Sequence, residues 1–296
     1  MTNDLKFEQN ANGVYVPSQP ATKLRSFYGR VIDKMPKLLS GKDIEGKVVD
    51  VPREPMTPKQ LVTERVNGQN QNDKQLLINN YVFTAYAVIP DPDSDEVILV
   101  PKSNPMVAEL IRGLNPKSNL TNGALDVDTE KYQAIKADKN SLTLSEDIAN
   151  GFRKSPYSQE KARQGAWDNM LEGDSKLRAD NLKLVQKIKG GSMKDRMGLW
   201  LPSTEYKGLR LLVVGSVGNN NNSNANGNNN LDNDNGRLVG IVKLWLGHFF
   251  LFILYININF RLKFFPWNES SFFSFGQYTN IHIVVEEIYE FFSCHL

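Results

Sequence analysis

The chain has 296 residues, and its 35 lysines and arginines nearly balance its 33 aspartates and glutamates. A single cysteine excludes an intramolecular disulfide, and a net charge of +2 is not typical of a dedicated nucleic-acid binder. The cysteine and all three histidines lie after Gly236, so residues 1–236 contain no cysteine nucleophile, histidine base or His/Cys metal site. The sequence therefore predicts neither a metal site nor a cofactor.

Residues 1–20 are rich in asparagine, glutamine and proline and show no hydrophobic period, so we expect them to be disordered. They lack the apolar run of a signal peptide, which predicts an intracellular protein. The next segment, 22–35, has apolar residues at spacings of three and four, the period of an amphipathic helix. Those residues are Leu24, Phe27, Val31 and Met35. Pro36 is expected to end this helix.

Capping patterns predict further helices along the body of the chain. Thr57 stands before Pro58, and Asn104 before Pro105, so each pair places a capping side chain ahead of a proline at the first helical position. Gly190 follows an amphipathic run and suits a helix end. The expected helices span about 57–67, 104–113, 155–170 and 175–189, where either Ser155 or Ser158 caps the third. We expect loops at 69–74 and at 114–140.

Two hairpins are predicted. Residues 81–89 form a continuous β-rich run, and 97–100 repeat it after a turn rich in aspartate and proline. Residues 209–214 and 237–242 are likewise apolar and β-branched, and we expect them to pair in antiparallel fashion. The fold class expected for the body, residues 21–217, is α+β.

The second hairpin would carry an asparagine-rich insertion, residues 218–236, at its tip. Asparagine supplies 11 of these 19 residues, so the segment has little apolar surface to bury. We therefore expect a disordered low-complexity loop. Its deletion is expected to cost little, because the entropy of closing a loop varies only with the logarithm of its length.

Two groups of charged residues are candidate sites. Asp91, Asp93 and Asp95 alternate in the first hairpin turn, but the glycine and glutamate of a calcium loop are missing, so we interpret them as turn residues. The stretch 176–210 is basic. Its candidate phosphate or nucleic-acid contacts are Lys187, Lys189, Lys194 and Arg196. The glycines at 190 and 191 follow a helix, so they are typical of a helix end and not of a phosphate-binding loop.

The C-terminal tail, residues 237–296, is rich in aromatic residues. Residues 238–256 are almost wholly apolar and just reach the length of a membrane span, although His248 lies near the middle. A buried hydrophobic subdomain is a second interpretation. Translated A/T-rich non-coding DNA is a third, because it yields the same mixture of residues; the gene model would then be wrong from about Lys243.

The sequence favours a non-catalytic interaction or structural protein that binds an unknown protein partner, with residues 238–256 as a candidate membrane anchor. One alternative is a nucleic-acid-binding module that uses the basic stretch 176–210. Another is an enzyme that relies on carboxylate or lysine chemistry, with a site that the sequence does not specify.

Overall fold

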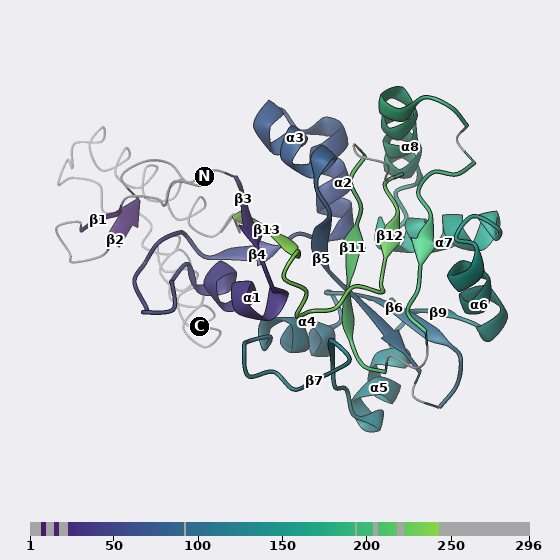
Figure 1. Cartoon of the computed structure of the whole chain (residues 1–296), viewed down its shortest axis with the longest axis horizontal. Coiled ribbons are helices and arrows are strands. Elements are labelled where there is room, and N and C mark those ends of the chain that lie inside the picture. Colours follow the sequence, from purple (N-terminus) through teal and green to yellow (C-terminus); the bar gives the residue numbers. More distant parts are fainter. Residues whose placement is uncertain are drawn as a thin grey trace, which may run out of the picture. The chain divides into compact units, whose positions relative to one another are not determined.

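The computed structural model describes residues 7–9, 15–17, 23–91, 93–192, 194–203, 207–217 and 222–242 (Figure 1). The chain divides into two compact units, 1–243 and 244–296, and every described residue belongs to the first. Within the N-terminal region, β1 (Phe7–Gln9) and β2 (Tyr15–Pro17) pair in antiparallel fashion, which the sequence did not predict.

A mixed sheet runs through the body of the molecule. In the order β10-β12-β11-β5-β13-β3 its strands are hydrogen-bonded side by side, while β4 pairs with β13, β6 with β5, and β9 with β6. The bounds are β3 Leu24–Tyr28, β4 Arg53–Pro55, β5 Val82–Pro90, β6 Val97–Pro101, β9 Leu142–Leu144, β10 Leu199–Trp200, β11 Arg210–Val214, β12 Ala225–Asn226 and β13 Arg237–Val242. A separate small hairpin joins β7 (Leu120–Thr121) to β8 (Ala124–Leu125).

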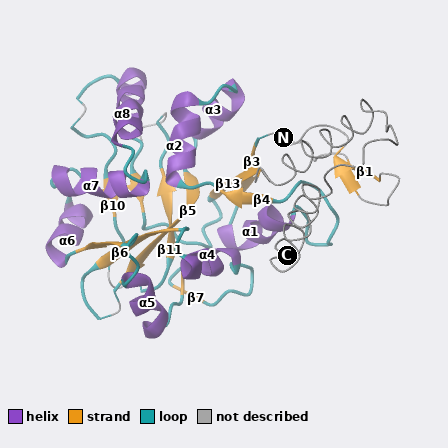
Figure 2. Cartoon of the chain, turned by 180° about the vertical axis from the view of Figure 1, so that it is seen from behind, coloured by secondary structure: helices purple, strands orange, loops and turns teal. Residues whose placement is uncertain are grey.

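Helices cover both faces of this sheet (Figures 1 and 2). The first core cluster packs the sheet against α2 (Pro58–Asn67), α3 (Gln71–Asn79), α6 (Glu146–Lys154), α7 (Glu160–Met170) and α8 (Ser175–Lys189). The second packs it against α1 (Val31–Ser40), α4 (Pro105–Arg112) and α5 (Thr129–Lys136). The described residues therefore form a mixed helix-and-sheet fold, as the α+β prediction requires.

Strand β5 explains why one apolar run in the sequence has no alternation. Side chains alternate across a strand, so Val82, Tyr86 and Val88 enter the first core, whereas Phe83 and Ala85 enter the second. All nine residues of β5 are buried. A strand covered on both faces reads as continuously hydrophobic, and the hairpin predicted with β6 is confirmed.

The helices predicted from caps are also confirmed. Thr57 and Gln60 form a reciprocal capping box at the start of α2, and the Asn104 side chain accepts the backbone N–H of Val107 at the start of α4. Helix α7 begins at Glu160, after the two predicted caps Ser155 and Ser158, and α8 spans the predicted 175–189. Local sequence was sufficient for these elements because each cap acts within one turn.

The helix predicted at 22–35 is wrong. Residues 24–28 form β3 instead, and α1 begins only at Val31, with Pro36 inside it. Leu24 and Phe27 enter opposite cores, because a spacing of three places two strand residues on opposite faces. Gly29 separates the two elements with φ of +121°, a value that glycine adopts without strain.

Both predicted loops also contain structure. The Asn70 side chain caps α3 by accepting the backbone N–H groups of Asn72 and Asp73, so residues 71–74 are helical. The segment 114–140 contains β7, β8 and α5, and α6 follows as a helix that the sequence did not predict. These elements are short and place few apolar residues in a core, which leaves little periodic signal.

The predicted pairing of 209–214 with 237–242 is wrong, although both strands exist. Strand β5 lies between them: β11 is antiparallel to β5, while β13 is parallel to β5 and antiparallel to β3 and β4. The asparagine-rich segment is therefore not a hairpin tip, and it must cross from β11 to the far side of β5 (Figure 1).

Residues 222–236 of that segment are ordered, contrary to the prediction. β12 lies within them, and Leu231 is fully buried; its N–H donates to Gly123 O at 2.8 Å and its carbonyl accepts Val31 N at 2.9 Å. Backbone hydrogen bonds, together with the burial of Ala225 and Leu231 in the two cores, hold this segment. Deletion of the asparagine-rich segment is therefore no longer expected to leave stability almost unchanged, since it would remove β12 from the main sheet.

The tail lies largely outside the described residues. Of the candidate span 238–256, residues 238–242 belong to β13 within the sheet. The remainder, from 243, and its proposed role as an anchor lie beyond the described part. Among the helices of the described ranges, none has the length and apolar character needed to cross a membrane.

Candidate functional site

Four outward-pointing asparagines form a row on the sheet, which we call the asparagine row: Asn222, Asn224, Asn226 and Asn228. They alternate with Ser223, Ala225 and Gly227, which are all buried, whereas the asparagines are partly or fully exposed. Alternation of exposed and buried positions is typical of a strand with one covered face, and Ala225–Asn226 within this segment form the short strand β12. The low-complexity segment therefore carries a strand pattern in which the inward residues are small instead of hydrophobic.

The backbone of the row is bonded on both sides. Toward the chain that leads into β10, Met197 N donates to Asn222 O, and Ala225 N donates to Gly198 O, each at 2.8 Å. Toward β11, Gly215 N donates to Asn224 O at 2.7 Å. Hydrogen bonds to segments on both sides therefore hold the backbone here, although only Ala225–Asn226 form a strand, β12, and Ser223 has a φ of +58°.

Its inward side chains are enclosed by buried groups. The hydroxyl of Ser223 accepts a hydrogen bond from Arg65 Nη1 at 2.8 Å and lies 3.4 Å from Asn181 Nδ2. Arg65 is fully buried and also donates to the carbonyls of Leu77 and Gly215. Burial lowers the pKa of the Arg65 guanidinium to about 9, because low-polarity surroundings disfavour its charge.

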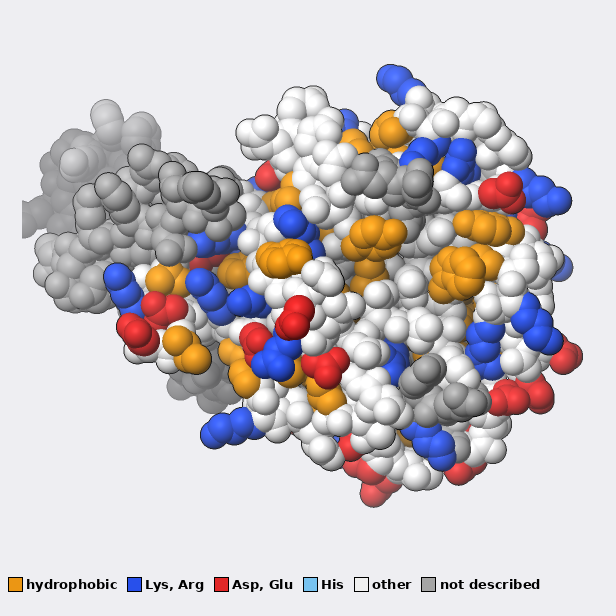
Figure 3. Space-filling model, viewed as in Figure 1, with side chains coloured by type: hydrophobic (Ala, Val, Ile, Leu, Met, Phe, Trp, Pro, Cys, Tyr) orange, Lys and Arg blue, Asp and Glu red, His pale blue; other side chains and the backbone are white. Residues whose placement is uncertain are grey.

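The outward side chains stand beside Trp200. Strand β10 pairs with β12 so that Trp200 is opposite Asn226, and 36% of Trp200 is exposed. Figure 3 shows apolar side chains exposed on this face in the region of β10, with lysine or arginine side chains near them. An aromatic side chain and a row of amides thus share one solvent-facing surface.

Internal hydrogen bonds orient the amides. Asn226 Oδ1 accepts the backbone N–H of Asn228 at 2.8 Å, and Asn224 Oδ1 accepts Gly198 N at 2.8 Å. Asn222 Oδ1 accepts Arg196 Nη1. No hydrogen bond within the described ranges uses the Nδ2 donors of Asn222 or Asn226, so each of these amides has a donor available to a partner.

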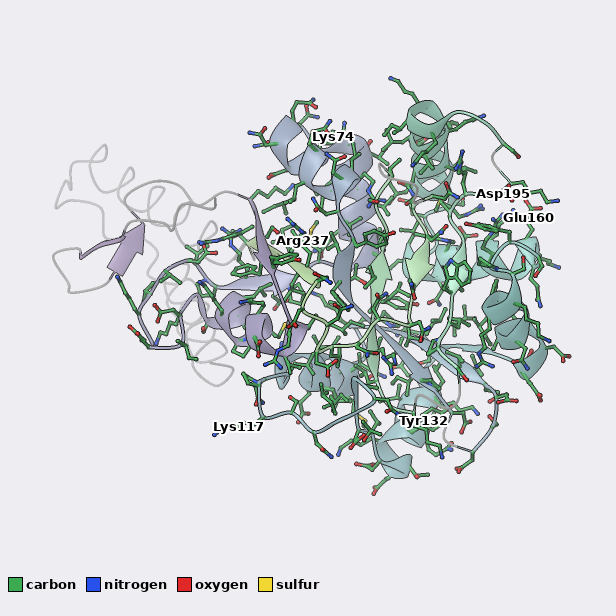
Figure 4. All side chains as sticks on the ribbon, viewed as in Figure 1. Lys74, Lys117, Tyr132, Glu160, Asp195 and Arg237 are labelled. Carbon is green, nitrogen blue, oxygen red and sulfur yellow. The ribbon has the colours of Figure 1, made fainter. Side chains whose placement is uncertain are left out.

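A second site, which we call the basic pocket, lies beside the row. It is a cavity of about 400 Å³ between α7, α8 and the loop that follows α8. Its lining residues are Glu160, Arg163, Gln164, Trp167, Arg178, Leu182, Lys194, Arg196 and Met197. Figure 4 marks Glu160 at the α7 end, with Asp195 close to it in the view. The pocket collects cations from three separate elements.

The structure divides the four predicted contact residues. Lys194 and Arg196 line the basic pocket, while Lys187 and Lys189 lie in the last turn of α8 and do not line it. The sequence missed Arg163 and Arg178, because they come from α7 and from the start of α8 and converge only on folding. Arg178 is within the predicted basic stretch, but no pattern in the neighbouring sequence indicates that it lines a pocket.

Arg163 builds the pocket wall. It is 6% exposed, and its Nη1 donates to the carbonyls of Lys194 and Arg196 at 2.9 and 3.0 Å. Burial lowers its pKa from the usual value. Arg178 Nε donates to Asp168 at 2.6 Å. The hydrogen bonds of Arg163 therefore hold the loop that carries Lys194 and Arg196.

The acidic turn serves the fold. Asp91 is buried; its carboxylate accepts the N–H of Asp93 at 2.9 Å and approaches Lys136 Nζ at 3.3 Å. Among the described residues, no group of three or more histidine, cysteine, aspartate or glutamate side chains could hold a metal ion. Asp91 thus stabilises the hairpin turn through these hydrogen bonds.

The chain matches no protein-family model and no curated protein. It is similar to one chain of a solved structure described as "Accommodation of massive sequence variation in Nanoarchaeota by the C-type lectin fold". The two are 13% identical, with a TM-score of 0.46, over 76% of this chain and 99% of that one. Similarity at this level assigns neither a family nor a function to this chain.

Proposed function

We propose that the chain is a non-catalytic binding protein whose recognition surface is the asparagine row together with Trp200. The observation that carries the proposal is the alternation at 222–228, which fixes every second side chain in the core and presents the others to solvent. Binding residues are often carried on exposed segments that a rigid scaffold positions, and hydrogen bonds to both neighbouring segments hold 222–228 in this way.

The chemistry of the surface suits a polar protein partner. Carboxamides donate and accept hydrogen bonds, so they adapt to many polar groups, and a partly exposed tryptophan supplies contact area at low entropic cost. Because the sheet already holds the row, binding would not need to order it. Preorganisation of this kind reduces the entropic cost of association.

The nucleic-acid alternative has weaker support. It needs a continuous basic surface, but Lys187 and Lys189 do not line the basic pocket that contains Lys194 and Arg196. Membrane attachment through 238–256 remains a separate prediction: residues 238–242 belong to β13, and the rest of the span lies outside the described ranges. Neither alternative uses the exposed amides of the asparagine row.

A peptide-display selection against the full chain tests the proposal. Selected peptides should lose at least about tenfold in affinity for Trp200→Ala/Asn226→Ala/Asn228→Ala, since aromatic and central contacts dominate such interfaces. The matched control is Tyr81→Ala/Asn79→Ala/Asn140→Ala, which removes one exposed aromatic and two exposed asparagines elsewhere. Circular dichroism would verify that both variants fold.

The proposal makes a definite demand of that selection. Peptides should retain full affinity for the control and lose it for the variant of the row. A selection that returns no binders, or binders equally affected by both variants, would refute a recognition role for this surface.

A further inference from the structure

The lining of the basic pocket has more positive than negative side chains. Its lining contributes Arg163, Arg178, Lys194 and Arg196 against the single carboxylate of Glu160. Two carboxylates lie outside the lining: Asp168 accepts one hydrogen bond from Arg178, and the charge of Asp195 acts on Arg163. The whole chain has a net charge of only +2, so this is a local concentration of cations.

Several of these cations have unused hydrogen-bonding capacity. Arg163 Nη2 is 4.0 Å from Glu160, too long for a hydrogen bond, and within the described ranges the Lys194 ammonium has no hydrogen bond or ion pair. Arg196 Nε is buried and has no hydrogen-bond partner there. A buried donor without an acceptor is costly, and an anion in the pocket would offset that cost.

The pocket also has an apolar side. Trp167 and Met197 are almost fully buried, and Leu182 is partly buried, so these three provide a hydrophobic wall beside the cations. A cavity of about 400 Å³ lies within the size range of small-molecule sites. Nucleic acid would need a longer track of phosphate contacts than a pocket of about 400 Å³ offers.

We propose that the basic pocket binds a small organic anion that combines a tetrahedral oxyanion, a phosphate or sulfate monoester, with an apolar body. The oxyanion would lie against Lys194 and Arg196, which approach from the loop that Arg163 holds. The apolar body would lie against Trp167 and Leu182. Arg163 is a positioning residue, because its guanidinium bonds the backbone of that loop.

Isothermal titration of the full chain with phenyl phosphate, phenyl sulfate, inorganic phosphate and phenol tests the proposal. At least one phenyl ester should bind about tenfold more tightly than inorganic phosphate and than phenol, because only the esters use both walls. The two esters together show whether the pocket prefers phosphate or sulfate.

Lys194→Ala and Arg196→Gln should each weaken binding of that ester about tenfold. The first removes an exposed side chain without a structural bond, so its result does not depend on loop integrity. The matched control, Lys187→Ala/Lys189→Ala, removes two charges outside the pocket and should leave the affinity unchanged. The Trp200→Ala/Asn226→Ala/Asn228→Ala variant should also bind the ester normally, which separates this site from the asparagine row.

The absence of ester binding would overturn the proposal, as would an equal loss in the control. The last titration uses a ten-nucleotide single strand of DNA as the ligand. If it binds more tightly than the esters and the control weakens it as much as Lys194→Ala does, the cations form a nucleic-acid surface and the small-anion site is rejected.

Discussion

At the scale of single residues, Arg65 connects three distant parts of the chain. Its guanidinium donates to Ser223 of the asparagine row, to the carbonyl of Leu77 at the end of α3, and to the carbonyl of Gly215 after β11. A lysine in its place has one nitrogen and could not reach all three acceptors. The planar shape of arginine is therefore the property that this position uses.

Arg65→Met is expected to lower the free energy of unfolding by at least about 2 kcal/mol, because two buried carbonyls and a hydroxyl lose their donor. Denaturant unfolding followed by circular dichroism measures the change. The matched control is Arg112→Met, whose side chain is 60% exposed and should change stability by less than about 1 kcal/mol. Equal losses of unfolding free energy in both variants would show that the buried hydrogen bonds of Arg65 do not stabilise the fold more than an exposed arginine does.

Asp91 supplies the prediction for pH. Burial alone raises the pKa of its carboxyl, but the hydrogen bonds from the backbone of Asp93 and from other groups, including Lys136, outweigh it and hold the pKa below 3.8. A depressed pKa stabilises the fold above the unfolded value, and this contribution is lost as the pH falls through the folded value.

The test compares the wild type with Asp91→Asn in urea between pH 7 and the acid limit of folding. The stability difference should be constant above about pH 5 and shrink as the pH falls below about 4. Glu109→Gln, which alters an exposed carboxyl on α4, is the control and should show little pH-dependent difference. If the stability difference between the wild type and Asp91→Asn did not shrink at acid pH, the hydrogen bonds to the ionised Asp91 carboxylate would be contradicted.

At the scale of elements, local sequence was informative where one turn or one strand decides the structure. The Thr57 and Asn104 caps and the apolar run of β5 could be interpreted without knowing the fold. The pattern failed at β3, where Leu24 and Phe27 have helical spacing but belong to two cores. It also failed for α3 and α5, which are short and polar.

The asparagine segment failed for a different reason. Asparagine content suggested disorder, although the alternation Asn-Ser-Asn-Ala-Asn-Gly-Asn at 222–228 was visible in the sequence. Period-two patterns are normally sought in hydrophobic residues, and here the inward positions are small. Of the candidate site, Lys194 and Arg196 could be predicted, but Arg163 could not, since only the tertiary fold brings α7 to the loop.

The segment yields a paired prediction. Gly227→Ala should cost about 1–3 kcal/mol, because the added Cβ would lie 2.8 Å from Val88 Cγ2 in the core. Asn228→Ala, one position along and exposed, should change stability by no more than about 0.5 kcal/mol. Thermal and urea unfolding of both variants provide the comparison. Similar effects at both positions would mean that 222–228 does not alternate between core and solvent.

At the scale of the whole molecule, strand order is what the sequence could not supply. Periodicity shows which residues face a core, but it does not show which strand is the neighbour. β13 is separated from β5 by about 150 residues, yet Leu238 pairs with Phe83, and Ser26 of β3 pairs with Val239. These contacts place β13 inside the sheet, with strands from the first hundred residues on both sides.

This position makes β13 the structural end of the body and predicts a sharp difference between two shortened chains. A chain that ends at Lys243 keeps β13 and should unfold cooperatively as a soluble monomer or oligomer. A chain that ends at Gly236 loses the strand between β5 and β3, exposes unpaired backbone on both, and should aggregate or fail to melt cooperatively.

Size-exclusion chromatography and thermal melting distinguish the two shortened chains, which differ by only seven residues, 237–243. Since the compact unit extends to residue 243, residues 1–243 should be sufficient for folding. Cooperative melting of the shorter chain would show that β13 is dispensable. Aggregation of the longer chain beside a soluble full-length protein would show that residues beyond 243 contribute to the core, and the two-unit division would have to be abandoned.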